Sequence, residues 1–205
     1  MSTPTRVRRS PLSQRHAREG ASWVSESAEW PNAYRSPGRE SAALRQAAGL
    51  LDWGPVDKYT VKGADAAVVA DAATPGAATG AAIATTIEGQ PAVVLLPAPD
   101  ETLVLLPYGG SAAALPGTLG HAASSMTDLS SGLSSFKLTG PAAPRLLQEL
   151  SLTDLGSVRL PDGHVVQAPL VGIHAIIARM DRAGVPSYTI LVPRDLAEYA
   201  WDAIL

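Results

Sequence analysis

The chain has 205 residues, a formal net charge of −3 and no cysteine. This length can hold one large domain or two small ones, and apolar residues make up 46% of it, enough for a real core. The slightly acidic balance gives no electrostatic reason to bind nucleic acid, and the lack of cysteine excludes disulfides, thiolate zinc sites and cysteine nucleophiles. No apolar run approaches the ~20 residues that a membrane helix needs, and the arginines near the start lack the apolar segment of a secretory signal. We therefore expect a cytoplasmic protein without membrane or nucleic-acid partners.

The first elements expected along the chain are an irregular segment and a helix. Residues 22–39 contain Trp23, Trp30 and Tyr34 among serine, proline and glycine, a composition typical of a loop held by aromatic contacts. Residues 40–51 place apolar side chains at helical spacing and predict a helix.

The rest of the chain contains an internal repeat. An alternating strand ends at Gly63 in one copy and at Gly140 in the other, and a helix follows each glycine at once. Each copy continues with a pair of apolar strands, at 91–97 and 102–107 and again at 172–180 and 188–193, and then with an Ala/Leu-rich segment at 111–124 or 195–205. Chance similarity between Ala-rich segments is the alternative, but it requires the order of several elements to match by accident.

This order predicts an α+β fold of two tandem ferredoxin-like modules, because strand pairs alternate with helices. We place an N-terminal arm and the first module in residues 1–125, and the second module in residues 126–205.

Four short sequences carry a resemblance to a known family. They are Ser-Pro-Leu at 10–12, His-Ala-Arg-Glu-Gly-Ala at 16–21, Leu-Arg-Gln-Ala-Ala-Gly-Leu-Leu-Asp at 44–52 and Lys-Tyr-Thr-Val-Lys-Gly-Ala-Asp at 58–65. Together they resemble the entry to the aminomethyltransferase (glycine cleavage T-protein) family, whose members transfer one-carbon units to or from tetrahydrofolate. The resemblance implies two related α+β modules and then a C-terminal barrel around a central hole that holds the pterin. It extends from about residue 10 to residue 205, so the chain looks like the folate-binding modules of a truncated form that lacks the barrel.

The two carboxylates that the resemblance implies for pterin binding are missing. One should lie in residues 88–97, where the inner positions are aliphatic, and the other in residues 179–190, where Gly-Val-Pro-Ser replaces the acidic core. Aliphatic side chains cannot accept the hydrogen bonds of a pterin edge, so the substitutions count against tetrahydrofolate as a cofactor. The four histidines are scattered, and no metal site is predicted.

Six residues are candidates for ligand binding, and no catalytic residue is assigned. Arg179 lies on an apolar strand, where its guanidinium needs either a ligand or an ion-pair partner. Four aromatic residues either line a central pocket or pack in the core: Trp30, Tyr34, Trp53 and Tyr188. Asp128, which precedes the second repeat, is interpreted as a capping or turn acid, as the resemblance also implies.

Three functions remain open. The chain could be a tetrahydrofolate-linked one-carbon transferase acting in a complex, or a non-catalytic accessory subunit that resembles the gamma subunit of heterotetrameric sarcosine oxidase. It could also be a repurposed small-molecule enzyme or binder with an apolar pocket. Without a barrel the module faces are left uncovered, and apolar patches mark interfaces. We therefore expect a homodimer or a subunit of a heteromeric complex.

Overall fold

The N-terminal arm is more regular than its sequence indicates. The computed structural model describes residues 9–25, 28–34, 36–54, 56–107 and 125–205. Helix α1 (Ser13–Arg18) leads into a hairpin of β1 (Ser22–Ser25) and β2 (Ala28–Ala33), and helix α2 (Pro37–Gln46) follows. The expected loop at 22–39 therefore contains a hairpin, in which Ser22 lies opposite Ala33 and Trp23 lies opposite Pro31.

The expected helix at 40–51 is wrong in its second half. Helix α2 begins at Pro37, in the first turn where proline costs no hydrogen bond, and ends at Gln46. Residues Gly49–Asp52 form strand β3, which pairs with β9 of the second module. Sheet pairing wins over helical spacing here, because residues 49–52 pair with β9 and Leu50 packs against the core of the second module.

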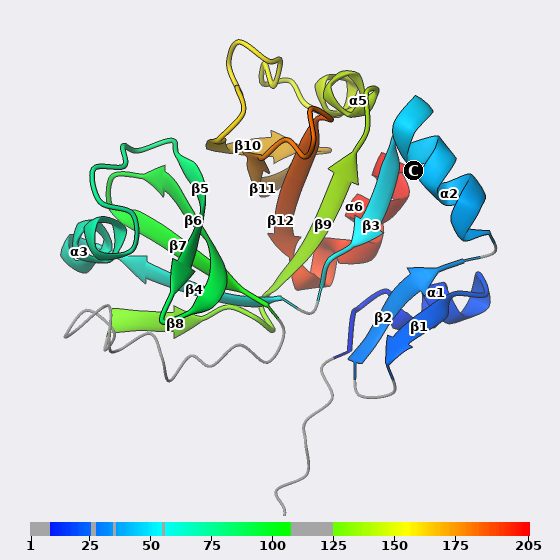
Figure 1. Ribbon diagram of the computed structural model, residues 1–205, viewed down its shortest axis with the longest axis horizontal. Coiled ribbons are helices and arrows are strands. Elements are labelled where there is room, and N and C mark those ends of the chain that lie inside the picture. The colour runs from blue at the N-terminus through cyan, green and yellow to red at the C-terminus, as the bar shows by residue number, and fades with distance from the viewer. Residues whose placement is uncertain (1–8, 26–27, 35, 55, 108–124) are drawn as a thin grey trace, which may run out of the picture.

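In the described residues, the first module is a five-stranded antiparallel sheet with helix α3 packed on it, coloured teal to green in Figure 1. The strand order is β5-β6-β7-β4-β8. Helix α3 (Ala64–Ala73) starts directly after Gly63, whose φ of 79° favours glycine. The strands are β4 (Asp57–Lys62), β5 (Ala82–Ile87), β6 (Gln90–Ala98), β7 (Glu101–Leu106) and β8 (Met126–Asp128).

The second module repeats this arrangement, with the strand order β10-β11-β12-β9-β3. Its strands are β9 (Leu133–Thr139), β10 (His164–Leu170), β11 (Ile173–Arg179) and β12 (Ser187–Pro193). Its helices are α5 (Ala143–Leu150), the 3₁₀ turn η3 (Arg194–Leu196) and α6 (Ala197–Ile204). The internal repeat and the α+β class with two tandem ferredoxin-like modules are confirmed. The Ala/Leu-rich segment expected at 111–124 lies outside the described residues.

Two strands of the repeat were not predicted. Strand β5 alternates between buried and exposed positions over only six residues, and β10 contains Pro169. Both strands lie at the edge of their sheet, where a proline and half-exposed side chains are tolerated.

The two modules exchange one strand each. Strand β3 precedes the first module in the chain but completes the second sheet, and β8 precedes the second module but pairs with β4 of the first. The expected division at residues 125 and 126 therefore does not coincide with the sheets. The exchange links the two modules through the backbone.

Three clusters of buried side chains form the core. One lies between α3 and the first sheet, and one packs α5, α6 and Leu12 of the arm against the second sheet. The third joins the facing surfaces of the two sheets, around Leu95, Leu105, Ile176 and Leu191. Figure 1 shows α3 and α6 on opposite sides of the paired sheets. In the described part of the chain, no helix has the length and apolar character of a transmembrane segment.

Candidate functional site

A pocket lies where the first sheet faces Trp53 and the turn between β11 and β12; we call it the central pocket. Its volume is about 390 Å³, within the range of small-molecule sites. The segments in which the resemblance implies the pterin carboxylates both reach it, through Val93 of β6 and through Arg182 of that turn. Its lining residues are Trp30, Trp53, Val56, Ala84, Thr85, Pro91, Ala92, Val93, Leu105, Leu106, Pro107 and Arg182.

The central pocket is apolar and carries a positive charge. Among the described residues that line it, none is a carboxylate, and Arg182 carries the charge. The pocket brings together two of the predicted aromatic residues, Trp30 and Trp53. A ligand here would meet indole rings, aliphatic walls and a guanidinium, which can donate hydrogen bonds but cannot accept them.

Lys137 of β9 lies beside this pocket. Its Nζ is 3.9 Å from the centre of the Trp53 ring, a cation–π contact. Burial, together with a smaller effect of the positive charge of Arg182, lowers the pKa of Lys137 to about 8. The side chain is half-buried, and among the described residues no carboxylate forms an ion pair with it.

A second pocket opens between α2, β2 and the edge of the second sheet; we call it the outer pocket. Its volume is about 490 Å³. Tyr34, another predicted residue, lines it, and so does Lys137. The remaining lining residues are Pro31, Asn32, Ala33, Pro37, Glu40, Ser41, Ala43, Leu44, Gly49, Leu50, Leu51 and Thr139.

A buried hydrogen-bond chain fixes Tyr34 in the wall of the outer pocket. The Tyr34 hydroxyl lies 2.7 Å from Nδ1 of His16, and Nε2 of His16 lies 2.9 Å from Oδ2 of Asp52. A carboxylate accepts hydrogen bonds, so Nε2–H donates to Asp52 and Nδ1 accepts the Tyr34 proton. The Ser10 hydroxyl and the Gly54 amide also donate to Asp52. Burial, with nearby carboxylates, raises the pKa of Tyr34, so the phenol stays protonated.

The same hydrogen-bond chain also attaches the N-terminal arm to the second module. The His16 ring is fully buried and makes edge contacts with Trp23, Tyr34 and Trp201 of α6. Arg15 bonds to Asp202 of the same helix. His16, which sequence reasoning named only as part of a family-like sequence, therefore helps to hold the N-terminal arm against the second module.

Arg179 and Tyr188 lie together but away from the pockets described. The Arg179 guanidinium makes two hydrogen bonds of 2.9 Å to Asp181 and donates to the carbonyl of Leu160. The hydrogen bonds from Arg179 lower the pKa of Asp181. Tyr188 is fully buried, 5.8 Å from the guanidinium, and its hydroxyl has no partner in the described structure. Arg179 thus has an ion-pair partner, and its role in ligand binding stays a prediction.

Asp128 and His164 form hydrogen bonds to the backbone two residues away, and His174 lies on a strand. Oδ1 of Asp128 accepts from the Ser130 amide at 2.8 Å, the geometry of a turn acid. His164 begins β10, where Nδ1 lies 3.0 Å from the Asp162 carbonyl, and His174 is exposed on β11. The described residues contain no cluster of side chains suited to a metal ion.

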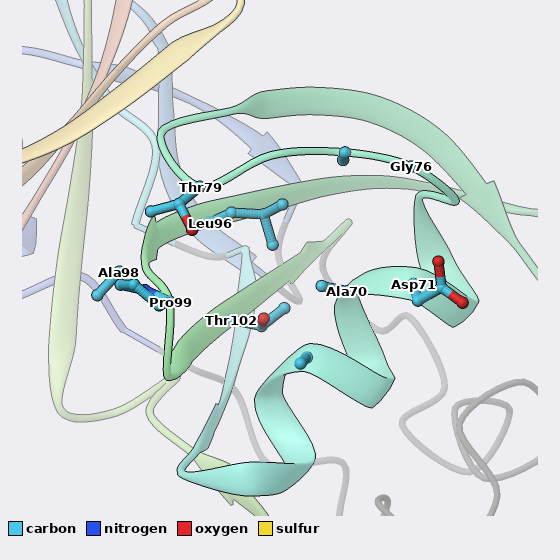
Figure 2. A pocket seen from close by; sticks show the side chains of 10 residues that line it. Ala70, Asp71, Gly76, Thr79, Leu96, Ala98, Pro99 and Thr102 are labelled. Carbon is cyan, nitrogen blue, oxygen red and sulfur yellow. The ribbon is translucent and has the colours of Figure 1, made fainter.

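A third, smaller cavity lies between α3 and the β6–β7 hairpin (Figure 2). Its volume is about 160 Å³, and among the described residues that line it Asp71 is the charged one. Figure 2 shows Asp71 at one end and Thr79 and Thr102 along the wall. The Thr102 hydroxyl already donates a hydrogen bond to the carbonyl of Ala66. The cavity offers too few free polar groups to orient a ligand.

Comparison with known proteins supports the resemblance. No protein-family model matches the chain. The chain is 30% identical to a curated protein named "Probable aminomethyltransferase" from Haloarcula marismortui, over 97% of this chain and 59% of that protein. It superposes on the glycine cleavage system aminomethyltransferase T from Bartonella henselae with a TM-score of 0.75 and 18% identity, covering 98% of this chain and 57% of that one. The chain has the T-protein fold.

A subunit of an oxidase shares this fold. The heterotetrameric sarcosine oxidase from Corynebacterium sp. U-96 contains a chain that matches with a TM-score of 0.67 and 21% identity, over 96% of this chain and 92% of that one. The chain thus spans 59% of the length of the curated relative but nearly the whole of the oxidase subunit.

Three residues of the site in this T-protein-like chain were missed by sequence reasoning: His16, Asp52 and Lys137. His16 and Asp52 stood inside the family-like sequences, yet nothing in their spacing indicated that they meet across 36 residues. Lys137 stands in strand β9 between the buried apolar residues Phe136 and Leu138, and a lysine at such a position was the signal that could have found it.

Proposed function

We propose that this chain is a non-catalytic subunit of a heteromeric oxidase related to sarcosine oxidase, in which the T-protein fold is kept without folate chemistry. The observation that carries the proposal is the composition of the central pocket, whose described lining residues include no carboxylate. The match to a chain of a heterotetramer over nearly the full length of both supports the same assignment.

A pterin would bind poorly in this pocket for a simple reason. Its amino and ring N–H groups need acceptors, and a buried donor left without one costs about 1–3 kcal/mol. Val93 and Leu105 offer none, and Arg182 presents further donors. Two unsatisfied donors would therefore weaken binding by roughly two orders of magnitude or more.

The first experiment tests folate binding directly. The purified chain is titrated with tetrahydrofolate and with its 5-methyl and 5-formyl forms by calorimetry, and thermal shifts are recorded in parallel. We expect neither heat nor a shift. Binding at micromolar strength to any of these forms would contradict the non-catalytic assignment.

The second experiment tests the complex. The chain is tagged in its native host, purified without denaturants and examined by light scattering and mass spectrometry, and hydrogen peroxide production is measured with sarcosine and other N-methyl amines. We expect co-purification in a heteromeric oxidase, and loss of that activity when the chain is deleted. A species of 21.2 kDa at every concentration, together with unchanged oxidase activity in the deletion strain, would refute the proposal.

A second function has a specific observation in its favour. The 30% identity to the aminomethyltransferase of Haloarcula marismortui is higher than the 21% identity to the oxidase subunit. A tetrahydrofolate-linked one-carbon transferase would follow if a partner chain supplied the missing acceptors. Only the transferase function predicts that this chain's pocket binds folate once the partner is added. Repeating the titration with the purified complex therefore separates the transferase from the non-catalytic subunit.

A further inference from the structure

We propose that the outer pocket is a binding site for a small apolar carboxylate, whose acid group pairs with the ammonium of Lys137. The site lies outside the central pocket and does not depend on the oxidase assignment. Four elements build it: β2, α2, β3 and β9.

Lys137 is a half-buried cation whose strongest contact is an aromatic face. Its Nζ lies over Trp53 at 3.9 Å, and among the described residues no carboxylate is paired with it. A partly buried charge is stable only when it is paired, and an anion supplies a charge-assisted hydrogen bond. Arg182 adds positive charge nearby. The geometry therefore favours an anion at this end of the pocket.

The rest of the pocket is suited to a hydrocarbon. Leu44 of α2 and Leu51 of β3 line it, and they remain 36% and 42% exposed. No residue of α2 is fully buried, so the apolar side of this helix gains contacts when the pocket is filled. At about 490 Å³ the pocket can hold a medium-chain or aromatic acid.

The other titratable groups in the wall already have partners. Oε1 of Glu40 accepts from the amides of Tyr34 and Ser36, so its charge serves the start of α2. The Tyr34 hydroxyl donates to His16. Of the described residues in the wall, Lys137 is thus the one placed to pair with a ligand's acid.

The pH dependence of binding follows from the same geometry. Burial places the pKa of Lys137 near 8, and a bound carboxylate would raise it by favouring the charged amine. Affinity should therefore be constant from about pH 6, where the ligand's acid is ionised, to pH 8 and fall about tenfold per pH unit above it, with a proton taken up on binding near pH 8.5. The other titratable groups that face this site are Tyr34 and Glu40 in the wall and Arg182 of the central pocket, and the raised pKa of Tyr34 keeps its phenol protonated over this range.

The test uses the full chain and three probes of equal length: octanoate, 1-octanol and octylamine. Binding is measured by calorimetry in two buffers of different ionisation enthalpy and by thermal shift. Lys137→Met removes the charge and keeps the length, Lys137→Arg keeps the charge, and Lys62→Met removes an exposed lysine of the first module as a control. Far-UV circular dichroism confirms that each variant is folded.

We expect octanoate to bind at least tenfold more tightly than octanol, and octylamine not to bind. Lys137→Met should abolish this preference and the proton uptake, while Lys137→Arg and Lys62→Met keep the preference. No binding of millimolar octanoate, equal affinity for octanol, or unchanged binding in Lys137→Met would each overturn the proposal. Octanoate should also protect Lys137 from acylation by acetic anhydride, read by peptide mass spectrometry, and equal labelling with and without octanoate would count against the site.

Discussion

Replacing Gly140 by alanine should destabilise the protein far more than replacing Gly63, although the two glycines occupy the same place in the repeat. Both have positive φ, 138° and 79° respectively, where a Cβ is disfavoured. A Cβ at Gly63 would have no heavy atom within 4 Å. A Cβ at Gly140 would lie 2.4 Å from the carbonyl oxygen of Ala47 and 2.6 Å from Cα of Ala48, both backbone atoms.

The magnitudes follow from these contacts. Alanine at Gly63, with its ψ of −150°, should cost about 1–3 kcal/mol of backbone strain. Gly140→Ala should add about 1–3 kcal/mol, because the junction of α2 and β3 must move. A difference of about 2 kcal/mol corresponds to about 4–8 °C in Tm for a chain of this size.

The assay is equilibrium unfolding in guanidinium chloride, monitored by circular dichroism, and the m-value should be the same in wild type and variants. The Tm is measured by differential scanning calorimetry. Because the α2–β3 junction borders the outer pocket, Gly140→Ala should also weaken octanoate binding, and Gly63→Ala should not. Equal losses of stability in the two variants, or a larger loss for Gly63→Ala, would refute the reasoning.

Three further outcomes are expected. His16→Ala should lower the free energy of unfolding by about 3 kcal/mol, since it removes the hydrogen bonds to Asp52 and Tyr34 and opens a cavity. Exposed His174→Ala should change it by less than about 0.5 kcal/mol, and similar losses for the two variants in urea unfolding would contradict the buried hydrogen-bond chain. Arg179→Ala should cost about 1–3 kcal/mol at pH 7. Because the pKa of Asp181 is lowered in the folded state, the ion pair stabilises the protein above about pH 4, the pKa of the unfolded state, and this stability is lost as the pH falls through the folded-state pKa. The free energies of unfolding of wild type and variant should therefore converge in acid. A difference that stays constant with pH would show that the ion pair is not responsible. Ala183→Asn, at φ 50° in the β11–β12 turn, should stabilise by roughly 0.5 kcal/mol, because asparagine tolerates this conformation, and a lower Tm would exclude that reading of the turn.

Local sequence patterns determined the repeat and the class of the fold. Strand, glycine and helix recur at Gly63 and Gly140, and the apolar strand pairs after them have period and length enough to be recognised without long-range contacts. The family-like sequences at the start of the chain carried the T-protein resemblance, which the comparisons in sequence and fold confirm.

Sequence could also show which chemistry is absent. The missing carboxylates of residues 88–97 and 179–190 were visible as letters, and the structure places Val93 and Arg182 from these segments in one pocket. It could not show that Arg179 finds Asp181 two residues away while Arg182 faces the pocket, because alternation along a strand fails at a turn.

Only the tertiary structure decided the strand exchange, the buried chain and the outer pocket. Helical spacing at residues 40–51 gave no hint that Leu50 and Leu51 would pair with β9, since a strand partner more than 80 residues away leaves no local signal. His16, Tyr34 and Asp52 meet because the arm folds back on the second module. The environment of Lys137 depends on the same docking. In the sequence it is an ordinary strand residue, and only the folded chain brings its ammonium onto the ring of Trp53 and its side chain into a pocket with α2 and β2.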